Sequence, residues 1–191
     1  MPLIDHFGLI APFYDGAIPL RYIEKIVAAL DLPVQGALLD AGGGTGRVTE
    51  ALRDYAGHII VGDLSLGMLR QARKKGDLSL ACTRSESLPF LDETFERVIM
   101  VDALHHVYDQ AVTCAQLWRV LQPGGRILIL EPDIRQFSVK VVALLEKIAL
   151  MRSHFLSAKR IARLFDYKNA QVRIDIERFN AWVTVDKTAL L

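Results

Sequence analysis

Cysteine is scarce in this chain, which has only Cys82 and Cys114 among its 191 residues. Neither stands at a spacing from other cysteines or histidines that is typical of a metal site, so we expect no bound metal. Cys82 falls in an expected strand and Cys114 in an expected helix. We therefore interpret both as core thiols of a protein in a reducing compartment, with the cytoplasm as the default location.

A large net charge and a run of basic residues are also lacking, and the pattern of a leader segment is not apparent in the first residues. The 23 Lys and Arg residues nearly balance 22 Asp and Glu residues, for a formal net charge of +1. No basic run is interleaved with aromatic residues, so we expect no nucleic-acid partner. The start contains Asp5 and His6 rather than a basic stretch followed by an apolar run, so no signal peptide is expected. Low-complexity segments and repeats are absent, and 51% hydrophobic with 24% charged residues fits one soluble α/β domain.

Glycine, in contrast, is concentrated between residues 42 and 46. The apolar run Ala37–Leu39 predicts a buried strand that ends at Asp40, and the apolar spacing over residues 48–52 predicts a helix. Gly42, Gly44 and Gly46 would allow positive φ angles and a close approach of ligand to backbone, and the helix start would offer free N–H groups. We expect a nucleotide-cofactor loop here, with a plain surface turn as the alternative.

The glycine pattern also discriminates between cofactors. A dinucleotide fingerprint, G-x-G-x-x-G, would need a glycine where Arg47 stands, so the pattern present is D-x-G-x-G-x-G. A second acid, Asp63, ends the apolar run His58–Gly62 about twenty residues further on, where a carboxylate can bind both ribose hydroxyls. The alternative for Asp63 is the N-cap of the next helix.

These motifs resemble those of class I S-adenosylmethionine-dependent methyltransferases. The segment 63–69 is similar to their D-x-S-x-x-M-L motif, residues 84–98 to their loop with Leu-Pro-Phe, and residues 98–107 to a strand that ends in His-His-Val. Residues 121–125 match L-x-P-G-G. The resemblance covers residues 36–133 and implies S-adenosylmethionine as cofactor, with S-adenosylhomocysteine as product. The cofactor contacts that it implies are Tyr14, Asp40, Ala41, Gly42, Gly44, Gly46, Asp63, Leu64, Met68, Ser85, Glu86 and Asp102.

One position departs from the family pattern. Relatives carry an acid for the adenine amino group where this chain has Arg84, and an arginine cannot accept a hydrogen bond from an amine. Either Glu86 takes over this role, or the Ser85 backbone and apolar stacking hold the ring, with Leu64 and Met68 as the apolar contacts.

The N-terminal segment Phe7–Asp15 resembles the F-x-x-I-A-x-x-Y-D opening of quinone-type small-molecule methyltransferases. In such relatives this arm folds over the cofactor, which makes Tyr14 a cofactor contact and a catalytic candidate. The alternative is simple apolar anchoring of a terminus. The fuller quinone signature is not evident over residues 16–20, so the quinone ring is not inferred as substrate.

His105 and His106 are the candidates for a general base, because they follow a buried strand at the edge where open α/β sheets bind ligands. Adjacent residues point in different directions, so we expect at most one of them in the pocket. The alternative is a packing or capping role for each. No third ligand with suitable spacing accompanies them, so they are not interpreted as a metal site. Asp102 is expected near the methionine end of the cofactor.

The expected architecture is a single Rossmann-like, doubly wound α/β domain over residues 1–191. Its mostly parallel, seven-stranded sheet would end in a reversed strand from a hairpin over residues 171–185, with the turn at Asn180. Residues 1–35 form the arm and a helix around Arg21–Leu30, 36–133 the cofactor core, 134–168 a helical substrate or lid region, and 169–191 the hairpin. The helix expected over 137–151 is too short and charged to span a bilayer. We expect this helix to be a lid over the substrate, a dimer face, a membrane-surface contact or a helix buried at the sheet edge.

The function that these features predict is methyl transfer from S-adenosylmethionine to a small, apolar or aromatic molecule. A non-catalytic cofactor-binding protein would keep Asp40, Gly42, Gly44 and Asp63 without turnover, and Arg84 favours that alternative. An NAD-dependent oxidoreductase is disfavoured by Arg47 at the third-glycine position.

Overall fold

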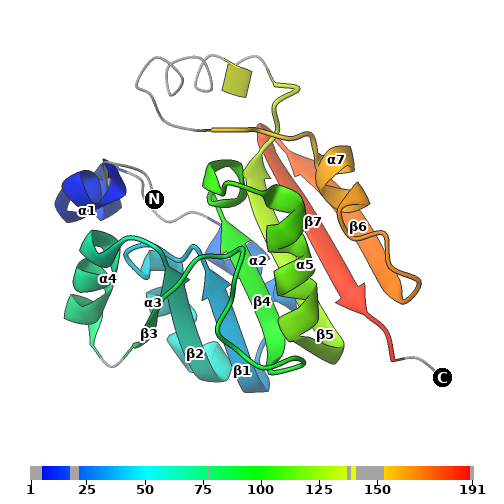
Figure 1. Cartoon of the computed structure of the whole chain (residues 1–191), viewed down its shortest axis with the longest axis horizontal. Helices are drawn as coiled ribbons and strands as arrows, with labels where there is room; N and C mark the ends of the chain where they lie inside the picture. The colour runs from blue at the N-terminus through cyan, green and yellow to red at the C-terminus, as the bar shows by residue number, and fades with distance from the viewer. Residues whose placement is uncertain (1–5, 18–21, 77, 137–138, 141–152, 190–191) are drawn as a thin grey trace.

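The computed structural model describes residues 6–17, 22–76, 78–136, 139–140 and 153–189 as one α/β layer structure (Figure 1). A seven-stranded sheet has the order β3-β2-β1-β4-β5-β7-β6. Among the described strands β7 alone runs opposite to the other six, so the expected mostly parallel sheet with a reversed C-terminal strand is confirmed. The strands are β1 Val34–Ala41, β2 Ala56–Asp63, β3 Ser79–Cys82, β4 Phe95–Val101, β5 Leu121–Pro132, β6 Ala170–Glu177 and β7 Asn180–Lys187.

Helices cover both faces of this sheet, with α5 and α7 on the near face and α2 behind it in Figure 1. The α-helices are α1 His6–Ala17, α2 Ile23–Leu30, α3 Arg47–Ala51, α4 Leu66–Ala72, α5 Gln110–Val120 and α7 Ala158–Arg163. Short 3₁₀ helices follow α3, α4 and β4; they are η1 Arg53–Tyr55, η2 Arg73–Lys75 and η3 Leu104–His106.

The central strands are apolar on both faces because each face packs against helices. Along β4, Val98 and Met100 belong to the core under α5 and α7, whereas Ile99 between them belongs to the core under α2 and α3. This alternation follows from the two-residue period of a strand. The carboxyl ends of β1, β2, β4 and β5 therefore meet at one edge, where the loops that carry the predicted site lie.

The N-terminal arm folds as a helix, α1, and lies on α4 at this edge. The backbones meet at Gly8 and Gly67, where a Cβ on Gly67 would come within 2.4 Å of the Gly8 Cα. Asp15 at the other end accepts a hydrogen bond from the Thr45 hydroxyl, and its second oxygen lies 2.5 Å from Lys75 Nζ. The arm is thus attached both to α4 and to the glycine loop.

Several expectations about local structure need correction. Cys82 is exposed at the end of edge strand β3, so only Cys114 is a core thiol. The hairpin turns at Arg178 and Phe179, with Arg178 at φ 55°, and Asn180 is already the first residue of β7. The helix expected from residue 21 begins at Ile23. The segment 137–151 lies outside the described residues except for 139–140, and no described helix is long and apolar enough to cross a membrane.

Candidate active site

The glycine loop connects β1 to α3 and is held against β2. The backbone N–H groups of Gly42 and Gly43 donate to the Gly62 carbonyl, at 2.7 and 3.2 Å. Gly42 has a φ of 69°, and a Cβ there would lie 2.6 Å from the Ala103 Cβ. Gly44 has a φ of 58°. Left-handed angles at both positions explain why the turn needs glycine. Gly46 is also left-handed but buried, and it faces Ala72 of α4.

Asp40 lies beneath this loop rather than on its surface. Its side chain is 1% exposed, and its Oδ2 accepts a hydrogen bond of 2.6 Å from the Thr49 hydroxyl. Burial and, to a lesser degree, the negative charge of Asp63 raise the pKa of Asp40 to about 6, although the hydrogen bond from Thr49 lowers it. A Cβ on Gly43 would collide with the Asp40 carboxylate at 2.6 Å. Asp40 and the equally buried Ala41 thus support the loop from below.

Asp63 connects the loop after β1 to the loop after β2. Its Oδ2 accepts a 2.9 Å hydrogen bond from the Gly44 N–H, and its Oδ1 accepts one of 2.7 Å from the Ser65 N–H. The N-cap of α4 is Ser65, whose hydroxyl accepts from the Met68 N–H, so the alternative N-cap role for Asp63 is wrong. Leu64 beside it is 46% exposed, whereas Met68 is buried below the loop.

The loop after β3 holds Glu86 in a different role from the one considered for it. Glu86 Oε1 accepts hydrogen bonds from the backbone N–H groups of Tyr108 and Asp109, and Oε2 lies 3.7 Å from Arg84 Nε. The carboxylate is therefore engaged with the segment that leads into α5. This leaves the half-buried Ser85 as the better of the two candidates for the adenine contact, which stays a prediction.

Tyr14, Arg47 and Asp102 converge from three segments at the carboxyl edge. The Arg47 guanidinium lies 3.3 Å from Asp102 Oδ2 and 5.9 Å from the centre of the Tyr14 ring. Burial raises the pKa of both Tyr14 and Asp102, and the positive charge of Arg47 opposes both shifts. Asp102 has a left-handed φ of 51°, a conformation that costs a non-glycine residue energy and is often found at functional sites. The sequence argument used Arg47 only to exclude a dinucleotide and missed its position among these groups.

His105 lies in η3 and is held by Glu131, at the end of β5. Its Nδ1 is 2.5 Å from Glu131 Oε2, and the two side chains are 5% and 3% exposed. Glu131 Oε1 accepts backbone N–H groups from Ala103 at 2.8 Å and Leu104 at 2.7 Å. Sequence reasoning missed Glu131, although it ends an apolar strand in the same way as Asp40 and Asp63 do.

His106 contacts both His105 and the arm. Its ring centre lies 3.9 Å from that of His105 and 4.8 Å from that of Phe7, which meets it edge-on. Burial lowers the pKa of His106 to about 3, and His105 adds to this effect. The ring is therefore neutral at physiological pH. The expectation that the two histidines would point apart is wrong, because their rings touch in the tight turn.

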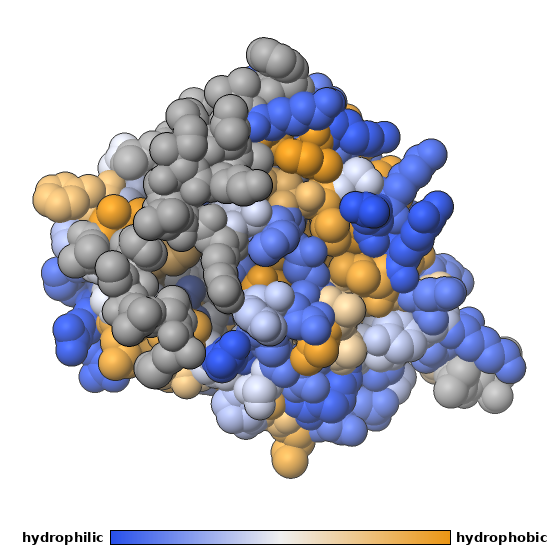
Figure 2. Space-filling view, turned by 45° about the horizontal axis from the view of Figure 1, so that its top comes forward, coloured by the Kyte–Doolittle hydropathy of each residue, from blue (hydrophilic) through white to orange (hydrophobic). Residues whose placement is uncertain are grey.

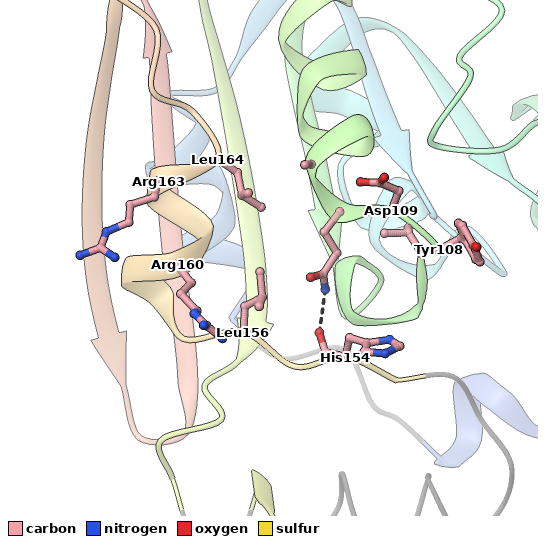
Figure 3. A pocket seen from close by; sticks show the side chains of 10 residues that line it. Tyr108, Asp109, His154, Leu156, Arg160, Arg163 and Leu164 are labelled. Carbon is pink, nitrogen blue, oxygen red and sulfur yellow. Dashed lines mark hydrogen bonds between the residues drawn. The ribbon is translucent and has the colours of Figure 1, made fainter.

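The segment Ser153–Leu156 packs against His105 and His106. The His154 N–H donates to the His105 carbonyl at 2.7 Å, and the Phe155 ring stacks on the His105 ring at 4.2 Å. The Gln110 amide donates to the carbonyl of Leu104 at 3.0 Å and to that of His154 at 2.6 Å, and the dashed line in Figure 3 marks the bond to His154. These contacts fix the backbone of η3.

A cleft of about 520 Å³ opens beyond this segment, between the start of α5 and α7 (Figure 3). Its apolar wall includes Val107, Leu156 and Leu164, and Arg160 lies at its edge. In Figure 2 this side of the molecule shows apolar side chains bordered by polar ones. The cleft is separated from the glycine loop by the histidine turn. Over the residues that the structure describes, no cluster of three His, Cys, Asp or Glu side chains could hold a metal ion.

Comparison with known proteins agrees with this geometry. Residues 39–129 match the family model described as a methyltransferase domain. The chain is 36% identical over 135 residues to the ubiquinone/menaquinone biosynthesis C-methyltransferase UbiE of Marinomonas sp. (strain MWYL1), covering 65% of this chain and 54% of that protein. It is 35% identical over 102 residues to the demethylmenaquinone methyltransferase of Corynebacterium urealyticum, covering 53% and 44%. The chain thus spans about half the length of these curated relatives.

Two solved structures share the fold at lower identity. One is a chain from the complex between the Haloferax volcanii Trm112 methyltransferase activator and a methyltransferase, with a TM-score of 0.81 and 20% identity, covering 98% of this chain and 100% of that one. The other is the [4+2]-cyclase SpnF, with a TM-score of 0.74 and 15% identity, covering 95% and 94%. These likenesses show the fold alone, since one fold can carry several chemistries.

Proposed function

We propose that the chain, whose residues 39–129 match a methyltransferase domain, is a class I S-adenosylmethionine-dependent methyltransferase that transfers the cofactor's methyl group to a small, apolar or aromatic molecule. S-adenosylmethionine is the cofactor of this family, and S-adenosylhomocysteine is the product that remains after transfer.

The observation that carries the proposal is the bridge between Asp63 and Gly44. It brings an acid at the end of β2 to the glycine loop at the end of β1, 19 residues earlier in the chain. A carboxylate has lone pairs for further donors, so Asp63 can accept the ribose hydroxyls while it holds the loop. Glycine at positions 42 and 44 permits the left-handed backbone of this loop, and Leu64 and Ser85 are the proposed contacts of the adenine.

The methyl acceptor is proposed from the relatives rather than from the site. The names of two of them specify C-methylation in ubiquinone and menaquinone biosynthesis and methylation of demethylmenaquinone. A reduced naphthoquinol with a short prenyl tail is therefore the first acceptor to test. The wider proposal is an apolar or aromatic acceptor, with no nucleic acid as partner and the cytoplasm as the location.

The chemistry requires little more than alignment and proton removal. The sulfonium methyl group is already activated, so holding the acceptor in line with the C–S bond and excluding water supplies much of the acceleration. Tyr14, Arg47 and Asp102 would surround the methionine end. An acceptor that loses a proton needs a base, and we assign that role to His105, because His106 has a pKa of about 3 and is a weak proton acceptor at neutral pH.

Isothermal titration of the chain with S-adenosylmethionine, S-adenosylhomocysteine and NADH tests the proposal. Micromolar binding of the first two without NADH is the expected result. Binding of NADH alone would instead support an oxidoreductase, which Arg47 disfavours.

A non-catalytic cofactor-binding protein is the second candidate, favoured by Arg84 in the position where relatives carry an acid. It would bind both sulfur cofactors but transfer no label from methyl-labelled S-adenosylmethionine to naphthoquinol or to other aromatic acceptors.

A further inference from the structure

We propose that Glu131 is a positioning residue that fixes the tautomer and the orientation of His105, so that the Nε2 atom of this histidine is the proton acceptor of the reaction. This inference rests on the proposed methyl transfer and adds a residue that neither the glycine motif nor the histidine pair points to.

The distance between Glu131 Oε2 and His105 Nδ1 requires a shared proton. At 2.5 Å the two atoms form a short hydrogen bond, and a lone pair on each without a hydrogen between them would repel. Glu131 Oε1 meanwhile accepts the N–H groups of Ala103 and Leu104. A carboxylate whose other oxygen accepts from two backbone N–H groups acts as an acceptor only, so the proton belongs to Nδ1. The lone pair of the neutral ring is then on Nε2.

Three further contacts keep the ring from turning. Phe155 stacks on one face with an interplanar angle of 16°, and His106 lies against the ring as well. The His154 N–H holds the His105 carbonyl. Glu131 and His105 are both almost fully buried, so water does not compete for the hydrogen bond between them.

The groups that act electrostatically on this pair come from several elements. Asp102, at the end of β4, interacts with both Glu131 and His105, and His106 interacts with His105. His106 remains neutral at physiological pH and adds no positive charge. The nearest carboxylate, Glu131, therefore dominates the stabilisation of a protonated His105.

The proposed step balances as follows. The acceptor gives its proton to His105 Nε2 and uses the freed electron pair to bond the methyl carbon. The C–S bond of the sulfonium breaks, its electron pair stays on sulfur, and S-adenosylhomocysteine forms. The new imidazolium is neutralised by Glu131 through the Nδ1–H bond, and the proton leaves to solvent after product release. Glu131 orients and stabilises, as the aspartate does in a Ser-His-Asp triad, without taking the proton itself.

The variant Glu131→Gln tests this assignment. The glutamine oxygen can still accept the two backbone N–H groups, which forces its NH₂ group toward His105 Nδ1. That nitrogen must then be an acceptor, so the ring proton moves to Nε2 and the base is blocked. Glu96→Gln is the matched control, because Glu96 also accepts a backbone N–H, from Gly36 at 2.9 Å, but lies far from the histidines at the start of β4.

Three measurements on the full chain separate the outcomes. Nitrogen-15 NMR of the imidazoles should show Nδ1–H at His105 in the wild type and in Glu96→Gln, and Nε2–H in Glu131→Gln. Titration should give the same dissociation constant for S-adenosylmethionine in all three. The kcat for a short-chain demethylated naphthoquinol should fall about 100-fold or more in Glu131→Gln, the scale of general-base catalysis, with little change in KM for the cofactor.

If NMR shows that wild-type His105 carries its proton on Nε2, the proposal is overturned whatever the turnover. It is also overturned if the tautomer of His105 switches in Glu131→Gln while kcat stays unchanged. A wild type that binds no S-adenosylmethionine would refute the proposed function instead, and the NMR result would still decide the tautomer. If Glu131→Gln does not fold, Glu131→Asp keeps the carboxylate but shortens its reach. It should retain the Nδ1–H tautomer and lose turnover by a smaller factor, and full activity in it would contradict a positioning role.

Discussion

Asp63 links two loops with one carboxylate, and this gives it two roles that a single substitution would remove. Asp63→Ala should weaken S-adenosylmethionine binding by about 1.5–3 kcal/mol, the scale for hydrogen bonds to a charged group. The reason is that the ribose contact is lost and Gly44 is no longer held. Titration calorimetry measures the effect, and Asp92→Ala, an exposed acid in the loop before β4, is the control. An unchanged dissociation constant would show that the ribose lies elsewhere.

The residues of the site differ in how far the sequence could reveal them. Asp40 and the glycines belong to one short motif and Asp63 to another, and the spacing within these motifs was enough to predict the residues. Glu131 acts on His105 from 26 residues away, and Asp15 acts on Thr45 from 30 residues away. Such pairs depend on which strand ends become neighbours in the sheet, and one sequence does not state that order.

Helix α1 is the element whose placement depends most on close packing. Gly67→Ala should displace it, because the added Cβ would lie 2.4 Å from the Gly8 Cα and neither backbone can yield easily. We expect faster amide exchange over residues 7–17 and weaker cofactor binding, since α1 carries Tyr14. Hydrogen-exchange mass spectrometry and titration measure the two effects.

Gly16→Ala provides the matched control, because it lies in the same helix and a Cβ there meets nothing within 4 Å. It should leave exchange unchanged or slow it slightly, as alanine favours helix over glycine. Equal exchange in Gly67→Ala and the wild type would mean that α1 does not depend on this contact.

At the level of elements, sequence periodicity predicted the strands well and the arm poorly. The apolar runs of β1, β2 and β4 end where an acid appears, and the hairpin of β6 and β7 follows from alternating polarity. The arm was predicted from resemblance as a segment that folds over the cofactor. Its helical form, with Pro12 inside, is favoured by the contacts of Gly8 and Asp15 with other parts of the fold rather than by a local signal.

For the molecule as a whole, the buried Asp40 should make stability depend on pH. Its pKa is raised from 3.8 to about 6, so between about pH 4 and 6 the folded state keeps a proton that the unfolded state has released. The wild type should therefore lose stability relative to Asp40→Asn as pH rises through this window, by about 3 kcal/mol in total at 1.36 kcal/mol per pKa unit. The asparagine oxygen can still accept from Thr49.

Urea unfolding of both proteins at pH 4, 5, 6 and 7 measures this difference. The free energies of unfolding should diverge up to about pH 6 and run parallel above it. Parallel curves over the whole range would show that Asp40 titrates normally in the folded state. Asp92→Asn, which changes an exposed acid in an ion pair with Arg119, is the control.

The reversed strand β7 has a consequence for how the chain is made. It is inserted between β5 and β6 and carries Trp182 into one core and Val183 and Val185 into the other. During synthesis β7 emerges from the ribosome after both of its neighbours and yet lies between them, so β5 keeps an unpaired edge until β7 has been made. A chain that stopped before residue 180 would leave both cores open, and it would be a target for chaperones and proteases rather than a smaller enzyme.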